Sequence, residues 1–425
     1  MISGKLNELP FDINLDIDFK GISIDTRTLK KGNIFIAITG DNFDGNQFSD
    51  EAIKKGAVAV IGTQQNATIQ VQNTLEALFK IAKWWRDKSS ATFIAITGSN
   101  GKTTTKEILL SILSQKNKTL ATSGNLNNHL GVPLTLCQLS LDDKYAIVEM
   151  GANHIGEITP LAELVRADIA IITNAYDAHL GEFGSLENIV KTKGELYQTL
   201  NENNIAIMND KSIHKKYWLS LLKTKKIYFF HKDIYATNIQ ANNTFDCNYQ
   251  QQKITINLHL LGKHNIENSL IASLTAIKLG LNLEEIKTGI EKCKPTKGRL
   301  KLIKINHITF IDDSYNANPT SMKASLEVLN NFQNNKIAVL GDMAELGEQS
   351  KTLHQEIGNY ALKIGIKHIL TLGNKAKDYQ GLHFKNHQQI AQYIIANIHQ
   401  PTTILVKASR LMQLEKIIDN YISLT

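Results

Sequence analysis

Residues 93–113, FIAITGSNGKTTTKEILLSIL, constrain the fold of this chain more than any other segment. An apolar run typical of a β-strand leads into a turn with two glycines, and a helical pattern with apolar Ile108, Leu109 and Ile112 follows at once. The free N–H groups and the positive end of such a helix point to one place, where a polyphosphate can bind. The segment therefore predicts a strand-turn-helix unit that holds a nucleotide.

Individual residues of the turn suit this role. Gly98 and Gly101 let the backbone approach phosphate groups, Lys102 adds a mobile positive charge, and the Thr103 hydroxyl can reach Mg²⁺. The turn is shorter than the common GxxxxGK[ST] loop, which would need glycine where Ile96 stands. The alternative is a strand-to-helix turn that binds nothing, but the Gly-Lys-Thr-Thr junction favours the nucleotide site.

Apolar strands alternate with helical patterns along most of the chain, which predicts an α/β fold with mainly parallel sheets. A chain of 425 residues is too long for one hydrophobic core, and we expect three domains. The alternation of apolar residues within 254–260 predicts an antiparallel extension of the central sheet. The expected domains are a small α/β domain at 1–82, a central nucleotide-binding domain at 83–297 and a C-terminal Rossmann-like domain at 298–425.

Composition excludes several classes of function. Lys and Arg exceed Asp and Glu by 47 to 40, but no block of like charges concentrates the excess, so nucleic-acid binding is not implied. No run of 18 apolar residues and no signal-peptide pattern occurs, so we expect a cytoplasmic protein without a membrane span. Cys137, Cys247 and Cys293 are scattered without metal-site spacing. A bound metal should therefore have mainly oxygen ligands.

Two side chains outside the turn are candidates for the same site. Glu149 ends an apolar run and so lies at the carboxyl end of a strand, where open α/β sheets bind ligands; the alternative is a solvated turn residue. Lys193 falls on the apolar face of a helical pattern, whereas Lys191 and Thr192 point elsewhere. Because burial disfavours an ammonium, Lys193 tends toward the neutral amine, which can capture carbon dioxide. The alternative for Lys193 is a lysine that extends to solvent at the helix edge.

Several further motifs are spread along nearly the whole chain. They are Asp25-Thr26-Arg27, Asp44-Gly45, GNLNNHLGVP at 124–133, VEMGA at 148–152, HLGEFGS at 179–185, KGE at 193–195, GKHNIEN at 262–268, KGR at 297–299, DDSYNANP at 312–319 and LGDMAELG at 340–347. In this order they resemble the Mur ligase family, whose nucleotide loop reads GxNGKT[TS]. Two of them, DDSYNANP and LGDMAELG, separate the member that adds D-alanyl-D-alanine from its siblings. One departure is Asn46, where the family often has histidine next to the uridine site.

The resemblance implies an ATP-dependent ligase that forms an amide bond through an acyl-phosphate, with ATP and Mg²⁺ as cofactors. Its implied substrates are UDP-N-acetylmuramoyl-tripeptide and D-alanyl-D-alanine. The first domain would bind the UDP-substrate, and the C-terminal domain would bind the dipeptide and part of ATP. We expect a monomer that closes around a hinge at 295–298.

Site residues follow from the resemblance position by position. The catalytic set would be Lys102, Glu149, His179 and Lys193, and Mg²⁺ would be held by Thr103, Glu149, His179 and Lys193 as its carbamate. For His264 a polar helix cap is an equal alternative. The substrate would contact Thr26, Arg27, Asn128, Asn316 and Asn318. ATP would contact Gly98, Ser99, Asn100, Gly101, Lys102, Thr103, Thr104, His264, Asn265, Asn268, Arg299 and Asp313.

The sequence leaves two rival functions open. A sibling ligase would add the third residue of the stem peptide or glutamate to folate. A nucleotide-dependent switch without ligase activity would need only residues 83–297, and would leave the motifs of the first and third domains unexplained.

Overall fold

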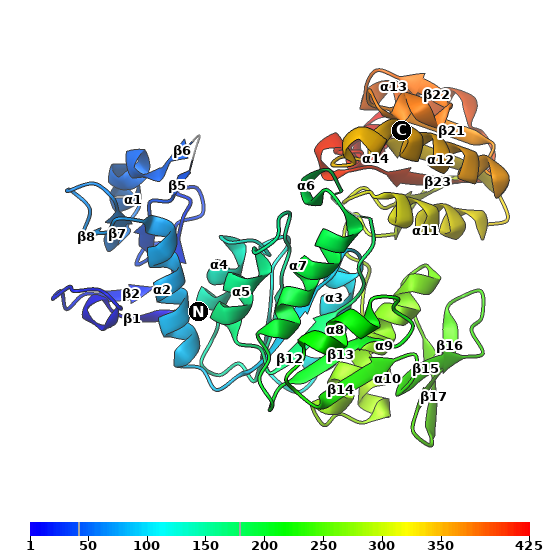
Figure 1. Ribbon diagram of the computed structural model, residues 1–425. Helices are drawn as coiled ribbons and strands as arrows, with labels where there is room; N and C mark the ends of the chain where they lie inside the picture. The colour runs from blue at the N-terminus through cyan, green and yellow to red at the C-terminus, as the bar shows by residue number, and fades with distance from the viewer. Residues whose placement is uncertain (41–42, 178–179) are drawn as a thin grey trace.

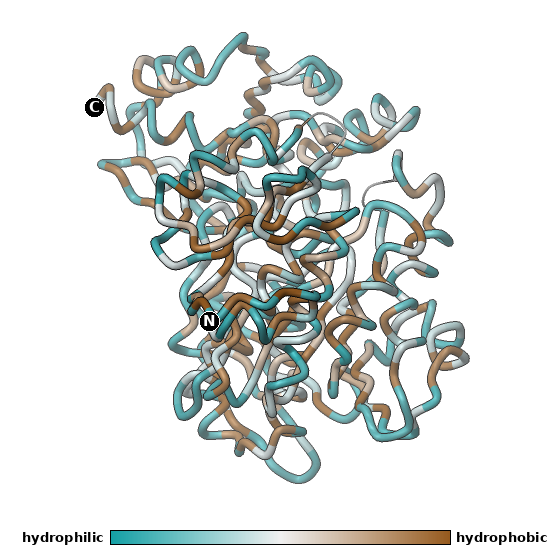
Figure 2. The backbone as a smooth tube through the Cα atoms, turned by 90° about the vertical axis from the view of Figure 1, so that its left-hand side faces the viewer, coloured by the Kyte–Doolittle hydropathy of each residue, from teal (hydrophilic) through white to brown (hydrophobic). Residues whose placement is uncertain are grey.

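The computed structural model describes residues 1–40, 43–177 and 180–425. The N-terminal and C-terminal parts lie at opposite sides of a central part, as the blue, green and orange-red colours in Figure 1 show. Hydrophobic stretches run through the interior in Figure 2, while many loops at the periphery are hydrophilic. Among the helices of the described residues, none has both the length and the apolar character needed to cross a membrane.

The N-terminal part is a small α/β unit around a parallel sheet of order β3-β4-β7-β8. Two antiparallel pairs, β1 with β2 and β5 with β6, flank this sheet. Its elements are β1 (Ser3–Lys5), β2 (Asp18–Lys20), β3 (Ile22–Ser23), β4 (Ile34–Ile36), β5 (Thr39–Gly40), β6 (Phe43–Asp44), α1 (Ser49–Lys54), β7 (Ala59–Gly62) and β8 (Ile69–Gln70).

The central part is built on a sheet of nine strands in the order β10-β11-β9-β12-β13-β14-β15-β16-β17. The first seven strands pair in parallel, and β15, β16 and β17 pair antiparallel, as the alternating pattern at 254–260 predicts. Its strands are β9 (Thr92–Thr97), β10 (Thr119–Ala121), β11 (Tyr145–Glu149), β12 (Ile169–Ile172), β13 (Ile205–Asn209), β14 (Lys226–Phe230), β15 (Ile234–Thr237), β16 (Thr244–Tyr249) and β17 (Gln252–Asn257).

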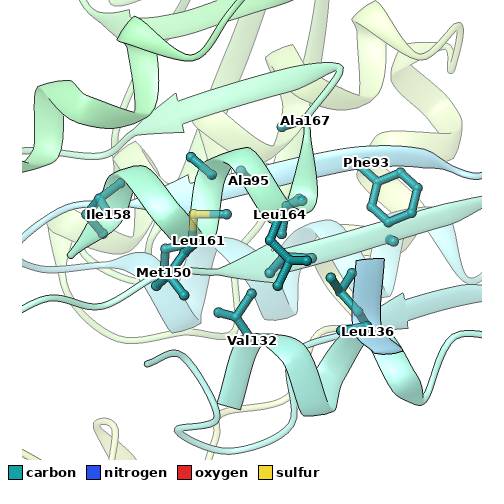
Figure 3. Packing of buried hydrophobic residues seen from close by; sticks show 14 of the residues in the cluster. Phe93, Ala95, Val132, Leu136, Met150, Ile158, Leu161, Leu164 and Ala167 are labelled. Carbon is teal, nitrogen blue, oxygen red and sulfur yellow. The ribbon is translucent and has the colours of Figure 1, made fainter. Parts of the chain in front are cut away.

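Helices cover both faces of this sheet because side chains alternate along each strand. Phe93 and Ala95 of β9 pack with α2, α4, α5 and α7, whereas Ile94 and Ile96 pack with α3, α9 and α10. Figure 3 shows Phe93 and Ala95 together with Val132 of α4 and other apolar residues of the cluster that includes α2, α4, α5 and α7. The helices are α2 (Thr74–Asp87), α3 (Lys102–Leu113), α4 (Gly131–Cys137), α5 (Ile158–Val165), α6 (Leu180–Phe183), α7 (Leu186–Gln198), α8 (Lys215–Leu221), α9 (Lys263–Lys278) and α10 (Leu283–Lys292).

The C-terminal part has a six-stranded sheet of order β18-β19-β23-β20-β21-β22, in which only the β18–β19 pairing is antiparallel. Helices α11 and α12 cover one face, and α13 and α14 cover the other. The elements are β18 (Lys301–Ile305), β19 (Ile308–Asp312), α11 (Pro319–Asn330), β20 (Asn335–Gly341), the 3-10 helix η3 (Gly347–Gln349), α12 (Ser350–Lys363), β21 (His368–Leu372), β22 (Leu382–Phe384), α13 (His387–Asn397), β23 (Thr402–Lys407) and α14 (Glu415–Leu424).

The fold agrees with the α/β class predicted from the sequence, and the expected strands and helices are present. The expected limit of the first domain at residue 82 falls inside α2 (Thr74–Asp87), which continues from the N-terminal part into the core of the central part. Trp85 of this helix donates its indole N–H to the Leu139 carbonyl at 2.9 Å. The helix thus belongs to both parts, and the exact division of the chain stays a prediction.

Candidate active site

A polar cavity of about 570 Å³ lies where the central and C-terminal parts meet. The carboxyl ends of the central strands open onto it, as expected for an open α/β sheet. Most of the site residues predicted from the sequence line this cavity, although they come from segments up to 220 positions apart. They are Gly98, Ser99, Asn100, Gly101, Lys102, Thr103, Thr104, Asn128, Glu149, Lys193, His264, Asn265, Asn268, Arg299, Asp313, Asn316 and Asn318.

Two predicted residues in the described part of the chain do not line the cavity, and a third, His179, lies outside the described residues. Thr26 and Arg27 belong to the N-terminal part, where the exposed Arg27 guanidinium donates to both carboxylate oxygens of Asp25. These hydrogen bonds lower the pKa of Asp25 to about 2. Asn46, which departs from the family pattern, is buried and bonded to Asp44 and Thr63, so its side chain holds the local fold.

The two glycines of the phosphate loop fit its backbone tightly. Gly98 and Gly101 have φ values of 145° and 83°, which favour glycine. A side chain at Gly98 would collide with the Thr173 hydroxyl, and one at Gly101 with the Asn268 amide. Because these neighbours come from β12's end and from α9, the glycines let the loop lie close to both elements. Helix α3 begins directly after Gly101, so its free N–H groups face the cavity.

Lys102 lies across the loop that it follows. Its Nζ donates to the Gly98 carbonyl at 2.6 Å and the Ser99 carbonyl at 3.3 Å. Burial lowers the pKa of Lys102, the Glu149 carboxylate opposes this effect, and the Arg299 guanidinium adds to it. The lysine is therefore held beside the position where the loop would bind phosphates.

Polar residues after β12 form hydrogen bonds to the phosphate loop. The Thr173 hydroxyl donates to the Asn100 carbonyl at 2.7 Å, and the Asn100 N–H donates to the Asn174 side-chain oxygen at 2.9 Å. The Ser99 hydroxyl donates to the Tyr176 carbonyl at 2.9 Å. Sequence reasoning did not assign Asn174, although it ends the apolar run IAIITN at the same sheet edge as Glu149.

Glu149 closes β11 and is only 2% exposed. Its Oε1 accepts a hydrogen bond from the Asn127 amide at 2.9 Å, while its buried Oε2 has no hydrogen-bond partner in the described part of the chain. A buried carboxylate oxygen without a partner is costly unless a cation or donor reaches it. This arrangement suits an oxygen-coordinated cation. Asn127 was missed at the sequence level, although it stands beside Asn128 in GNLNNHLGVP.

Asn128 and Thr103 have local partners. The Asn128 side chain accepts from the N–H groups of Leu130 and Gly131 and so orders the turn before α4. The Thr103 hydroxyl accepts a hydrogen bond from Arg299 Nη2 at 3.0 Å. This contact joins the start of α3 to the C-terminal part.

Lys193 is buried in α7, as its place on the apolar face predicts, and is 3% exposed. Burial, and after it the positive charge of Lys102, lower its pKa to about 7, although Glu195 and Glu157 oppose the shift. Thr192, which we expect to point elsewhere than Lys193, is also fully buried. Its hydroxyl donates to the Asn188 carbonyl at 2.8 Å, which satisfies the hydroxyl inside the helix.

Helix α9 supplies an amide network at another wall of the cavity. Asn268 donates to Asn265 at 2.9 Å, and Asn265 donates to the Leu261 carbonyl at 2.7 Å. Gly262 occupies the N-cap position, so His264 lies inside the helix and is not its cap. Burial lowers the pKa of His264, and the Asp313 carboxylate opposes this shift.

The C-terminal part contributes charged and amide groups. Arg299 stacks its guanidinium over the Tyr315 ring at 4.3 Å. Asp313 accepts from Lys407 Nζ and from the Ser325 hydroxyl, each at 2.6 Å. The Asn318 amide donates to the Asn100 side chain at 2.8 Å.

Asn316 is exposed beside this group, and its carbonyl accepts from Lys407 at 2.8 Å. Lys407 was not identified from the sequence, although it ends β23 (Thr402–Lys407) at the same sheet edge as Asp313. The signal was available in the position of Lys407, directly after the apolar run ILV.

Together, the fold and the cavity define a class of protein: an α/β nucleotide-binding enzyme whose phosphate loop faces a second α/β domain. Family models agree with this class and make it specific. The model described as the Mur ligase family catalytic domain matches residues 18–85, the Mur ligase middle domain matches 96–276, and the Mur ligase glutamate ligase domain matches 298–410. The chain belongs to the Mur ligase family.

Individual relatives resemble the chain over almost its whole length. UDP-N-acetylmuramoyl-tripeptide--D-alanyl-D-alanine ligase of Haemophilus influenzae is 36% identical, over 95% of this chain and 93% of that protein. The crystal structure of MurF from Acinetobacter baumannii has a TM-score of 0.94 at 33% identity, covering 100% of this chain and 99% of the other. MurF from Thermotoga maritima in complex with ADP has a TM-score of 0.84 at 26% identity, covering 95% and 97%.

Proposed function

We propose that this protein is an ATP-dependent ligase that joins D-alanyl-D-alanine to UDP-N-acetylmuramoyl-tripeptide in peptidoglycan precursor synthesis. The observation that carries the proposal is the shared cavity, in which a phosphate loop, a buried carboxylate and the DDSYNANP segment meet. The relatives that match the chain from end to end bear this activity in their names. We place the reaction in the cytoplasm, where ATP is available, and expect a monomer.

The proposed reaction has two steps. A carboxylate oxygen of the UDP-tripeptide attacks the γ-phosphorus of ATP, the bond to the bridging oxygen breaks, and an acyl-phosphate and ADP result. The dipeptide amine then attacks the acyl carbon, phosphate leaves with the C–O electron pair, and the amine loses a proton. Both steps place negative charge on phosphoryl or tetrahedral oxygens, so preorganised positive groups are the main requirement.

The phosphate loop would position ATP for the first step. We assign 98–104 to the phosphates, with Lys102 as the charge that moves from the loop carbonyls to phosphate oxygens. His264, Asn265 and Asn268 are assigned to the adenine side. Arg299 and Asp313 would reach the nucleotide from the C-terminal part; an arginine fork suits phosphate oxygens.

Magnesium fits the residues of the cavity. The unpartnered Oε2 of Glu149 and the Thr103 hydroxyl offer oxygen ligands next to the loop. When bound, Mg²⁺ would neutralise charge on the phosphates. In the described residues no group of three or more His, Cys, Asp or Glu side chains forms a metal site by itself, so phosphate oxygens would complete the coordination. We also retain the assignment of His179 to a metal.

Lys193 would contribute an anion if its neutral amine captured carbon dioxide. Its pKa of about 7 leaves a large neutral fraction near neutral pH. The carbamate would form when the amine nitrogen bonds to the carbon of CO₂ and loses a proton. We propose that this group supports Mg²⁺ beside Glu149.

The three parts of the chain would divide the substrates between them. We propose that residues 1–82 bind the UDP-substrate through Thr26 and Arg27, that 83–297 bind ATP, and that 298–425 bind the dipeptide and part of ATP. Asn128, Asn316 and Asn318 would then contact the peptide substrates.

An acceptor-dependence assay tests this function. The protein is incubated with ATP, Mg²⁺ and UDP-tripeptide, and ADP release is followed with D-alanyl-D-alanine, with single amino acids, or with no acceptor. The proposal predicts ADP release that depends on the dipeptide, with the UDP-pentapeptide as product. Dependence on a single amino acid would instead identify a sibling ligase, and phosphate release without any acceptor would identify a nucleotide switch.

A further inference from the structure

The central and C-terminal parts touch through backbone atoms at a point outside the cavity lining. The Gly181 N–H of α6 donates to the Glu345 carbonyl at 2.8 Å. This bond joins the HLGEFGS segment to the LGDMAELG segment, next to η3 (Gly347–Gln349). Figure 1 shows α6 extending from the central part toward the C-terminal part. We call this contact, made by Gly181, Glu345 and Gly347, the glycine contact.

A side chain at position 181 would crowd the glycine contact, because the nearest atoms are backbone atoms of the C-terminal part. A Cβ there would lie 3.1 Å from the Gly347 nitrogen and 3.2 Å from the Glu345 oxygen. Gly347 has a φ of 58°, and Glu345 presents its carbonyl from a φ of 61°, which a residue with a side chain seldom adopts. Such a conformation persists only where the surrounding structure maintains it. The backbone at Glu345 is therefore held in one position, in which its carbonyl can accept from Gly181.

The chain segment that precedes α6 is bonded to the phosphate loop. Asn174 accepts from Asn100, and the Tyr176 carbonyl accepts from Ser99. One residue further on, Asp177 lines a second cavity of about 380 Å³ together with residues of α11 and α12. Described residues on both sides of 178–179 thus contact the two elements: Asn174 and Tyr176 bond to the phosphate loop, and Gly181 bonds to the C-terminal part.

We propose that Gly181 is a positioning residue that docks the C-terminal domain onto the central domain for the ligase reaction. This inference rests on the proposed function, because the dipeptide and the acyl-phosphate would be held by different domains. A displacement of about 1 Å between reacting groups can cost on the order of 100-fold in rate. A Cβ at position 181 would push the C-terminal backbone back by a few tenths of an ångström, and the larger valine side chain would push it further, at a point outside the cavity lining.

The test replaces Gly181 by alanine and by valine in the full-length protein. Alanine favours the helical state over glycine, so Gly181→Ala should not weaken α6. We expect kcat to fall about tenfold or more for Gly181→Val and by a smaller factor for Gly181→Ala, with KM for ATP changed less than twofold. Because loss of the docked arrangement lets the whole C-terminal domain move away, small-angle scattering should show a larger radius of gyration for Gly181→Val than for the wild type when both are saturated with Mg·ADP.

Glu348→Ala is the matched control, because Glu348 is exposed and lies directly after Gly347. It should keep the wild-type kcat and radius of gyration. If Gly181→Val lowers the thermal midpoint, Gly181→Ala decides, and an unchanged kcat in that variant overturns the inference. Wild-type kcat in both variants does the same. Wild-type protein that fails to join the dipeptide at all would instead overturn the proposed function.

Discussion

At the scale of single residues, burial gives Lys193 a chemistry that its residue type alone does not specify. Its ammonium form loses hydration inside α7 and lies near the charge of Lys102, so its pKa falls to about 7. Lys191, two positions earlier, is exposed and pairs with Glu187 at 2.8 Å, which raises its pKa. The same residue type on two sides of one helix thus has opposite pKa shifts.

Replacing Lys193 by alanine should lower kcat roughly 100-fold, because a preorganised charge next to the phosphates is lost. Added bicarbonate or formate should restore part of that activity if the carbamate is the group that supports Mg²⁺. Wild-type activity that depends on bicarbonate should rise as pH increases through about 7, since only the neutral amine reacts with CO₂. Steady-state kinetics across this pH range measure both effects.

Lys191→Ala is the control on the same helix and should keep wild-type kinetics. Full activity of Lys193→Ala would rule out a catalytic role for the lysine. Loss without rescue would favour a purely structural role for its side chain.

At the scale of elements, the residue that caps α11 also binds the phosphate loop. Asn318 caps α11 by accepting from the Ser321 N–H at 2.8 Å, and its amide nitrogen donates to Asn100. Pro319 occupies the first turn, where its missing N–H costs nothing. The start of α11 is therefore fixed at the loop by one side chain that serves both elements.

Asn318→Ala should lower the free energy of unfolding by about 1 kcal/mol through loss of the cap. It should also raise KM for ATP severalfold, because the loop loses its partner in the C-terminal part. Asn386→Ala provides the comparison: Asn386 caps α13 in the same domain by accepting from Gln389 at 2.9 Å. Chemical denaturation and kinetics should show similar destabilisation in both variants, with altered ATP kinetics in Asn318→Ala only. Equal kinetics in the two variants would contradict the loop-coupling role.

At the scale of the whole molecule, one hydrophobic core joins the first two parts. It includes Ile2 and Leu6 from the N-terminal part, Trp85 of α2, and Phe93 and Val132 of the central part. The C-terminal part has its own two clusters, one on each face of its sheet. The interface with the central part consists of the polar cavity, hydrogen bonds such as Arg299 to Thr103, and the packing of Leu261 against one C-terminal cluster.

Calorimetry should therefore resolve two unfolding transitions, one for the first two parts together and one for the C-terminal part. Cooperative units follow shared cores. Mg·ADP should raise both transition temperatures, because a ligand that binds only the folded state across both parts stabilises each. A single transition without nucleotide, or three separate ones, would contradict this division of the core.

Much of the fold could be predicted because its signals are local. Apolar strands such as β9 and β11 are short and bounded by turns, and the Gly98 to Thr104 loop follows from one strand-helix junction. Local signals did not predict where the helices end, nor that α2 belongs to two domains. The same apolar stripe of α2 contacts two domains, and no local pattern distinguishes one partner from two.

The sequence by itself determined the α/β class, the phosphate loop and the placement of Glu149 and Lys193, since periodicity and glycine positions act over a few residues. Only the tertiary structure decided which side chains meet. Asn127 reaches Glu149, Lys407 reaches Asp313, and Thr192 is fully buried. Each of these depends on distant segments or on the packing of a whole helix. The packing of distant segments decides which side chains are buried and which form hydrogen bonds, and no single stretch of sequence specifies this packing.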